Sequence, residues 1–231
     1  MSSAIIFLTS SKKPLKLALA SIYLLIPVYN LKRSFYYLGM ARQKDYDRHE
    51  VLAKAVDVFW QKGYKACSVT DLVKATGLNT ASMYKEFGDK EGLFEESLVH
   101  YRQYVLSPRL NALKQDPTLK GIEAFLQSVI QGATSKRYRG CLMMNHLSQK
   151  HSISPRAEQL LSDFCSAMES LLETAFRNAQ LEGDISKDKD PAILASFVTC
   201  TVHGLVLYGR YTHKKHPIPK LFDVIFQTLQ D

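Results

Sequence analysis

The part of the sequence that follows Met40 repeats one set of signals: a helix-capping residue, then apolar residues three or four positions apart, then a glycine. Apolar residues at this spacing lie on one face of an α-helix, whereas a half-buried strand alternates apolar and polar residues. We find no clear alternating run and no Asn-Gly hairpin after Met40. The pattern therefore predicts an all-α fold.

Four helices are predicted in the first part of this region. Each begins at a side chain that can accept a hydrogen bond from the backbone of the first turn. At Asp47 and Ser68 an acidic residue three positions later completes a capping box. The predicted starts are Asp47, Ser68, Asn79 and Asp89, and the first three helices end at Gly63, Gly77 and Gly88. The fourth should bend or stop near Pro108.

Five further helices are predicted after Pro108. They are an amphipathic helix over 119–130, a short helix within 140–149, a long helix from Ser154 to Gly183, an apolar helix over 193–211 that begins at Asp190-Pro191, and a final helix over 220–229. The helix over 193–211 is apolar on several faces, so packing on one side cannot bury it.

Residues 1–39 differ in composition from the rest of the chain. They contain "LALASIYLLIPVYNL" over 17–31, which is shorter than the roughly 20 residues that span a bilayer. No small-residue cleavage site follows, as a signal peptide would require. We therefore expect translation to start at Met40 and residues 1–39 to be an extra segment that is either not ordered or not native.

The overall charge is a weak argument for a nucleic-acid partner. Of the 30 basic residues, five lie in 1–39, which has no acidic residue, so 25 basic residues face 22 acidic ones in the remainder. A local basic surface is needed instead. The four cysteines, Cys67, Cys141, Cys165 and Cys200, are far apart and show no disulfide-framework spacing. This usage fits the reducing cytoplasm.

The predicted helices on either side of Gly77 form the most informative pattern. Two short helices joined by a tight glycine turn are typical of a helix-turn-helix, whose second helix enters the DNA major groove. In that second helix Met83 and Phe87 are four positions apart and should face inward. Thr80, Ala81, Tyr84 and Lys85 would then face solvent or DNA. The alternative is an ordinary helical hairpin with a solvated polar face.

The segment "FWQKGYKACSVTDLVKATGLNTASMYKEFGDKEGLF" resembles the DNA-binding half of the TetR family of bacterial transcriptional regulators. The likeness lies in an aromatic-x-x-Lys-Gly-Tyr that ends the first helix, Ser-Val-x-Asp-Leu that opens the second, Thr-Gly-Leu at the turn, and Tyr-x-x-Phe-x-x-Lys-Glu-x-Leu. It covers about 47–97 and is highly specific.

The resemblance implies a dimeric transcriptional repressor that binds a palindromic operator and is released by an effector. It implies a three-helix DNA-binding domain at 40–95 and a helical effector-binding and dimerisation domain at 96–231. The implied DNA-binding residues are Thr70, Asn79, Thr80, Ala81, Ser82, Tyr84, Lys85 and Lys90, with Thr70, Tyr84 and Lys90 on phosphates. Glu86 departs from the family pattern, and a carboxylate near phosphates is unfavourable.

A second, shorter resemblance concerns "RGCLMMNHLSQ", which is similar to a Gly-Cys-Leu segment in one branch of the family. In that branch the cysteine is associated with sensing electrophiles or oxidants. Lys136, Arg137 and Arg139 are close in sequence to Cys141, and nearby cations lower a thiol pKa. The candidate effector or sensor residues are Cys141, Met144, Phe125, Phe164 and Met168. The alternative is that Cys141 is a small buried apolar residue and the others are ordinary core.

The last two helices are predicted to form an intersubunit four-helix bundle with the same helices of a second subunit. Gly204 and Gly209 would permit close approach of the two backbones. The alternative is that these helices belong to a core within one chain. A homodimer, an operator DNA and a small-molecule effector are therefore the predicted partners, and no membrane partner is predicted.

Other classes of function have less support. The sequence contains no Gly-x-Ser-x-Gly elbow, phosphate loop or His-Glu-x-x-His, so no catalytic residue and no cofactor is predicted. No metal site is predicted either, because His146 and His151 follow Cys141 at helical positions that do not converge. Two alternatives stay open: a DNA-binding regulator tethered to a membrane through 1–39, and an unrecognised helical enzyme.

Overall fold

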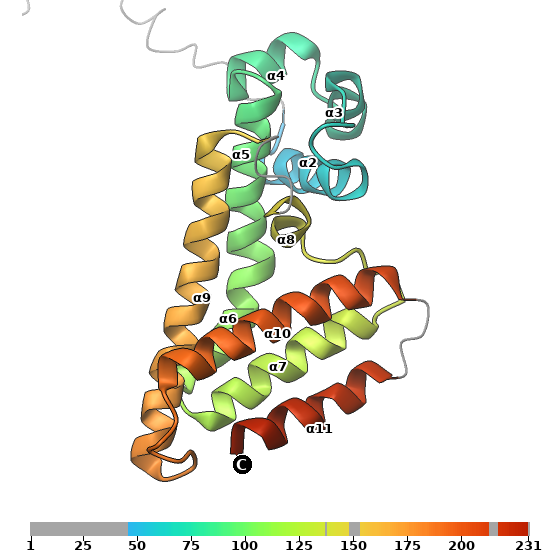
Figure 1. Ribbon diagram of the computed structural model, residues 1–231. Helices are drawn as coiled ribbons and strands as arrows, with labels where there is room; N and C mark the ends of the chain where they lie inside the picture. Colours follow the sequence, from blue (N-terminus) through green and yellow to red (C-terminus); the bar gives the residue numbers. More distant parts are fainter. Residues whose placement is uncertain (1–45, 137, 148–152, 213–216, 231) are drawn as a thin grey trace, which may run out of the picture. The chain divides into compact units, whose positions relative to one another are not determined.

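The computed structural model describes residues 46–136, 138–147, 153–212 and 217–230. Every regular element in these segments is helical, which confirms the predicted all-α class (Figure 1). The predictions about residues 1–39 and a start at Met40 lie outside the described residues, as do Arg137 and His151.

The first four described helices follow the predicted caps closely. They are α2 (Arg48–Lys62), α3 (Val69–Thr76), α4 (Thr80–Phe87) and α5 (Lys90–Tyr101). The side chains of Asp47, Ser68, Asn79 and Asp89 each accept a first-turn backbone hydrogen bond. The predicted capping box is complete at Ser68, and Gly77 turns the chain at a φ of 78°, a left-handed conformation that glycine adopts without strain.

The helix after α5 does not stop at Pro108. A π-helical turn, η1 (Arg102–Leu106), comes first, and α6 (Ser107–Gln115) then continues the helix. The backbone N–H of Ser107 bonds to the carbonyl of Arg102, five residues back. Pro108 is therefore in the first turn of α6, where its missing N–H costs little. The irregularity expected at this proline appears as a π-turn rather than as an end.

The remaining helices are α7 (Leu119–Thr134), α8 (Leu142–Leu147), α9 (Pro155–Glu182), α10 (Pro191–Tyr211) and α11 (Pro217–Gln230). Ser154 and Asp190 cap α9 and α10 as predicted, each followed by proline. The last helix begins at Pro217, three residues before the predicted start, because proline fits the first helical position.

The helices form two layers. The first layer contains α2, α3 and α4, the second contains α6, α7, α10 and α11, and α5 and α9 run between them (Figure 1). The helices α2 and α3 pack together and α2 also packs along α5, while α4 contacts both α3 and α5. At the other end α7 contacts α6, α9, α10 and α11, and α10 lies across α9 (Figure 1). The small helix α8 lies between these groups and contacts α5, α9 and α10. This position makes α8 a link between the two ends of the chain.

One described helix, α10, is long and apolar enough to cross a membrane by length and composition alone. A core helix of a water-soluble protein can have the same length and composition. In α10, 39% of the most apolar stretch of 18 residues is buried. Because α10 packs on α7 and α9, its composition is accounted for in part by the core.

Candidate nucleic-acid interface and effector cavity

The short helix α4 presents a small, polar face to solvent. Met83 and Phe87 are buried against the rest of the domain, as the sequence pattern predicted. Thr80, Ala81 and Lys85 are exposed, and the ring of Tyr84 is 47% exposed. The side chains that could reach a groove are therefore on one side of the helix, and the side chains that hold it are on the other.

The other predicted contact residues border this face. Thr70 is exposed in the first turn of α3. The side-chain oxygen of Asn79 accepts a hydrogen bond from the backbone N–H of Ser82 at 2.7 Å, so Asn79 serves as the cap of α4. Ser82 is half-buried.

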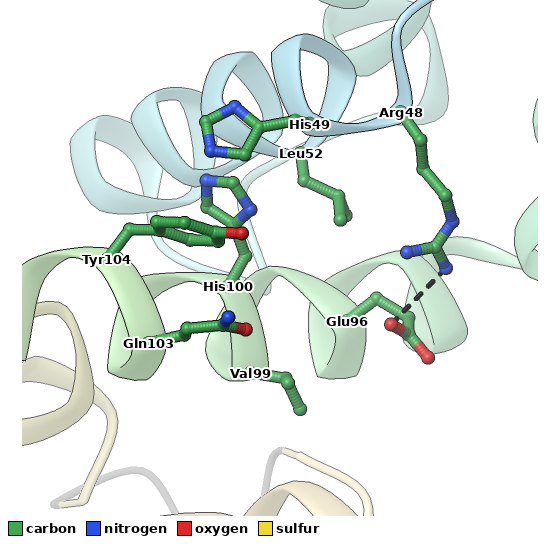
Figure 2. A pocket seen from close by; sticks show the side chains of 8 residues that line it. All are labelled: Arg48, His49, Leu52, Glu96, Val99, His100, Gln103 and Tyr104. Atoms are coloured by element: carbon green, nitrogen blue, oxygen red, sulfur yellow. Dashed lines mark ion pairs between the residues drawn. The ribbon is translucent and has the colours of Figure 1, made fainter. Parts of the chain in front are cut away.

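Glu86 does not face the surface where phosphates would bind. Its carboxylate accepts a hydrogen bond from Arg48 Nε at 3.1 Å, and its side chain is only 16% exposed. Arg48 also pairs with Glu96 on α5, at 3.3 Å (Figure 2). Arg48 of α2 thus connects α4 to α5. Its positive charge also offsets the negative charge of Glu86, which the sequence analysis expected to be unfavourable near phosphates.

Lys90 has a different position from the one predicted. Its ammonium donates to the backbone carbonyls of Tyr64 and Cys67, at 3.0 Å each, and lies 4.4 Å from the centre of the Tyr64 ring. These contacts fasten the α2–α3 connection to the start of α5. We therefore treat Lys90 as a residue that positions the domain, because its charge already has partners within the protein.

The contact between α2 and α5 contains a cluster of rings. His49 of α2 meets His100 of α5 and Tyr104, and the ring centroids of each pair are 4.5 to 4.7 Å apart (Figure 2). Burial lowers the pKa of His100, and the neighbouring His49 lowers it further. Arg48 and Glu96 are the other charged groups that line this hollow. The cluster therefore favours neutral His100 at the helix contact.

A second buried histidine links the connection between α2 and α3 to α8. His146 Nε2 accepts from the backbone N–H of Tyr64 at 3.2 Å, and Nδ1 bonds to the Leu142 carbonyl at 2.8 Å. This arrangement assigns the neutral tautomer that carries its proton on Nδ1. Burial lowers the pKa of His146, and Arg210 lowers it further, whereas the bond to Leu142 acts in the opposite direction.

We expect the protein to lose stability as the pH falls below about 6.5, the usual histidine pKa. Because folding lowers the pKa of His100 and of His146, the unfolded chain binds more protons than the native chain below that pH. The stabilisation is fully present above pH 6.5. Urea unfolding at pH 7.5 and 5.5 should show a lower midpoint at 5.5, and H100Q combined with H146Q should reduce that difference. An equal pH dependence in the double variant would contradict the assignment.

All five predicted effector residues line one cavity between the helices of the second layer. Phe125 of α7, Cys141 and Met144 near α8, and Phe164 and Met168 of α9 form part of its wall. The rest of the wall is Leu106, Arg109, Leu110, Val129, Val202, His203 and Val206. Sequence reasoning thus identified the apolar side of the cavity but missed its two basic side chains.

The predicted low pKa of Cys141 is wrong. Burial raises the pKa of this thiol, and hydrogen bonds from the backbone of Met144 and from Tyr101 only partly oppose that effect. Arg139, which was expected to lower the pKa, instead pairs with Asp57 at 2.8 Å and lies over the Trp60 ring. Cys141 is therefore a buried thiol in the cavity wall, whose thiolate form is disfavoured.

The segment around α8 joins this cavity to α2. Trp60 Nε1 donates to the Arg139 carbonyl at 3.3 Å, and Asn145 Nδ2 donates to the same oxygen at 3.0 Å. At the start of α8, the N–H of Leu142 donates to the hydroxyl of Tyr101 of α5 at 3.3 Å. A displacement of α8 by a ligand would therefore reach α2 directly through these bonds.

An exposed apolar stripe runs along α10. Its positions, spaced alternately by four and three residues, are Ile193, Phe197, Cys200, Gly204, Leu207 and Tyr211. A Cβ added to Gly204 would meet nothing, whereas Gly209 packs against Ala133 and Tyr138 of its own chain. The predicted close approach at Gly209 is thus internal to the chain. The exposed side of α11 is mostly polar.

Comparison with known proteins agrees with this geometry. Residues 51–97 match the model of bacterial regulatory proteins of the tetR family, and residues 118–224 match the tetracyclin repressor-like C-terminal domain. The repressor ComR of Escherichia coli is 30% identical over 172 residues, which cover 73% of this chain and 82% of ComR. The chain belongs to the TetR family. The resemblance of about 47–97 to this family is confirmed, as is the general function of a DNA-binding transcriptional regulator.

Solved TetR-family structures agree with the fold. CifR, a TetR-family transcriptional regulator, was solved as a cysteine mutant with a 26-base-pair operator DNA. It is 28% identical, with a TM-score of 0.70, and the match covers 80% of this chain and 98% of CifR. The reduced form of NemR from E. coli is 16% identical with a TM-score of 0.69, and it supports the fold alone.

Several residues of this TetR-family chain that matter for the site gave no readable signal in the sequence. Arg48 is 38 residues from Glu86, and Arg139 is 82 residues from Asp57. Such pairs form only through tertiary packing. Arg109 could have been noticed as a basic residue among the apolar positions of its helix, but the spacing does not show that it faces a cavity.

Proposed function

We propose that this TetR-family regulator is a repressor that binds a palindromic operator as a homodimer and leaves it when a small molecule binds in the second layer. It acts in the cytoplasm, needs neither cofactor nor metal, has no catalytic role and has no membrane partner. Its DNA-binding domain is 40–95, and its effector and dimerisation domain is 96–231. The observation that supports this most is the exposed small-residue face of α4, held by buried Met83 and Phe87.

The proposed contacts divide into readout and positioning. Thr80, Ala81, Ser82 and Lys85 supply or border the contacts to base edges, because small side chains let α4 approach the floor of the groove. Thr70 and Tyr84 bind phosphates through their hydroxyls, which fixes the position of the domain without reading sequence. Asn79 caps α4 and presents its first turn.

The relatives support the same role. ComR is named a transcriptional repressor, and CifR was crystallised with a 26-base-pair operator. A dimer places two recognition helices about 34–36 Å apart on successive major grooves, which suits a palindromic site. The α10 stripe supplies an apolar surface for the second subunit, with Gly204 at its centre.

Release is proposed to pass through α8. A molecule in the cavity touches Cys141 and Met144 on one side of this segment. The other side holds α2 through Trp60 and holds the α2–α3 connection through Tyr64. A shift of α8 would move one DNA-binding domain relative to its twin, and a coupling of about 1–3 kcal/mol changes operator affinity 5- to 150-fold.

The experiment that tests this function is to map the genomic DNA bound by the protein and to measure binding to the recovered sites. We expect a small set of palindromic sites bound tightly, with about 10³-fold or greater preference over random DNA. Equal affinity for recovered and random sequences would contradict the proposal.

We expect K85A and K90A to differ, although both remove one lysine from the same domain. K85A should weaken operator binding and reduce the slope of log affinity against log salt by about 1, because one phosphate or base contact is lost. K90A should leave that slope unchanged and destabilise the fold by about 2 kcal/mol, because two carbonyls lose a charged donor.

Fluorescence anisotropy of labelled operator at several salt concentrations measures the slope, and urea unfolding measures stability. Each variant is the control for the other. A reduced slope in K90A with unchanged stability would show that its ammonium leaves Tyr64 and Cys67 to bind phosphate.

A further inference from the structure

The cavity that holds the predicted effector residues contains two basic side chains, Arg109 and His203, in an otherwise mostly apolar wall. Arg109 lines the cavity from α6, and its guanidinium packs against Gly132 of α7. A Cβ atom added to Gly132 would be 3.4 Å from Arg109 Nη1 and 3.5 Å from Nη2. Within the described segments no hydrogen bond or ion pair to this guanidinium is found, and no aspartate or glutamate lines the cavity. The cavity thus carries a positive charge without a counter-charge in its wall.

A second polar group in the wall also lacks a partner. The Nε2 atom of His203, on α10, is buried without a hydrogen-bond partner. Buried polar atoms of this kind are rare, because leaving a donor or acceptor unpaired costs free energy. Burial lowers the pKa of His203, and the negative charge of Glu169 opposes this effect. The Glu169 carboxylate already accepts a hydrogen bond from the Ser196 hydroxyl.

The chemistry of the two groups limits what can bind. A guanidinium matches a carboxylate with two parallel hydrogen bonds, and such charge-assisted bonds are stronger where water is excluded. The remaining wall, formed by phenylalanine, methionine, leucine and valine side chains, matches a hydrocarbon tail. Cys141 also lies in this wall, and its raised pKa disfavours the thiolate that would attack a ligand. The proposed binding is therefore non-covalent.

The size of the cavity limits the tail. The volume open to the centre of a water molecule is about 40 Å³, and one water needs about 10–15 Å³ on that measure. Only a molecule of a few heavy atoms fits without rearrangement. Met144 and Met168 are flexible enough to make room for somewhat longer chains.

We propose that the effector of this regulator is a small amphiphilic carboxylate, whose anionic head binds Arg109 and whose short apolar tail lies among the apolar side chains of the cavity, with His203 in the same wall. The proposal rests on the proposed function for its consequence, which is release of the operator. The binding step itself needs no DNA.

Direct binding tests the site. Isothermal titration of the DNA-free protein with straight-chain carboxylates of two to eight carbons should show binding with an optimum at short chain length. The amide and the alcohol of the best chain should bind at least tenfold more weakly, because they cannot pair with the guanidinium. R109Q should lose most of this preference and R109K should recover part of it. Equal binding of the carboxylate and its amide, or no binding of either, would overturn the proposal.

The comparison of carboxylate with amide uses the unmodified protein, so it remains decisive if R109Q fails to fold. A thermal unfolding scan identifies that case. Operator release is measured separately, by anisotropy of labelled DNA with and without the best carboxylate. Carboxylate binding without release would leave the site standing and contradict effector control. Tight operator binding with no carboxylate binding would overturn the site and leave the DNA-binding function intact.

Discussion

The double variant F197E/L207E is expected to be a monomer that binds its operator about 10²- to 10⁴-fold more weakly than the wild type. Both side chains are exposed on the α10 stripe, and Leu207 is 61% exposed within one chain. Two glutamates at a symmetric apolar interface would meet their copies across the dimer axis and remain without partners. A monomer keeps one recognition helix, and it loses the gain in affinity that linked binding sites provide.

Sedimentation at micromolar concentration gives the oligomeric state, and anisotropy of labelled operator gives the affinity. L181E is a matched control, because Leu181 is an apolar residue that is 82% exposed at the end of α9, outside the stripe. It should remain a dimer with normal operator binding. If F197E/L207E sediments as a dimer, the second subunit binds elsewhere.

The substitution A81E is expected to reduce operator binding about 100-fold or more without destabilising the protein. Ala81 is exposed at the second position of α4, so a glutamate there meets no protein atom that it must displace. An acidic residue in the first turn favours the helix dipole, which should hold stability constant or raise it slightly. In a groove lined by phosphates the same charge is repelled, and contacts between like charges cost several kcal/mol.

The matched control is A167E, the same change at an exposed position within α9. Both variants should unfold at wild-type urea concentrations, whereas only A81E should fail to bind operator. Normal operator binding by A81E would place α4 outside the groove and remove the central argument for the DNA contacts. Loss of binding in both would indicate a general effect of added negative charge.

Features of this protein that depend on neighbours in sequence could be predicted from the sequence. The caps at Ser68, Asn79 and Asp89 form bonds within three residues, so their spacing fixes where the helices begin. The inward direction of Met83 and Phe87 follows from one helical turn. The fold class and the exposed face of α4 were predictable for this reason.

Features that depend on contacts between distant helices could not be predicted. Arg139 is two residues from Cys141 in sequence, yet it points to Asp57 and Trp60 of α2. Lys90 follows the exposed end of α4, yet it bonds to carbonyls more than 20 residues earlier. Its closeness in sequence suggested that Arg139 would act on the Cys141 thiol, and its place after α4 suggested that Lys90 would be free to bind phosphate. In both cases tertiary packing provided a better partner.

The contact of Trp60 with Arg139 has an experimental consequence. Trp60 is the only tryptophan of the chain, and its indole both donates to the Arg139 carbonyl and lies 4.3 Å, centroid to Cζ, below the Arg139 guanidinium. A movement of α8 therefore changes the surroundings of the single tryptophan, whose emission can be excited selectively over that of the tyrosines. Its emission would follow the passage of a signal from cavity to DNA in real time, without any label.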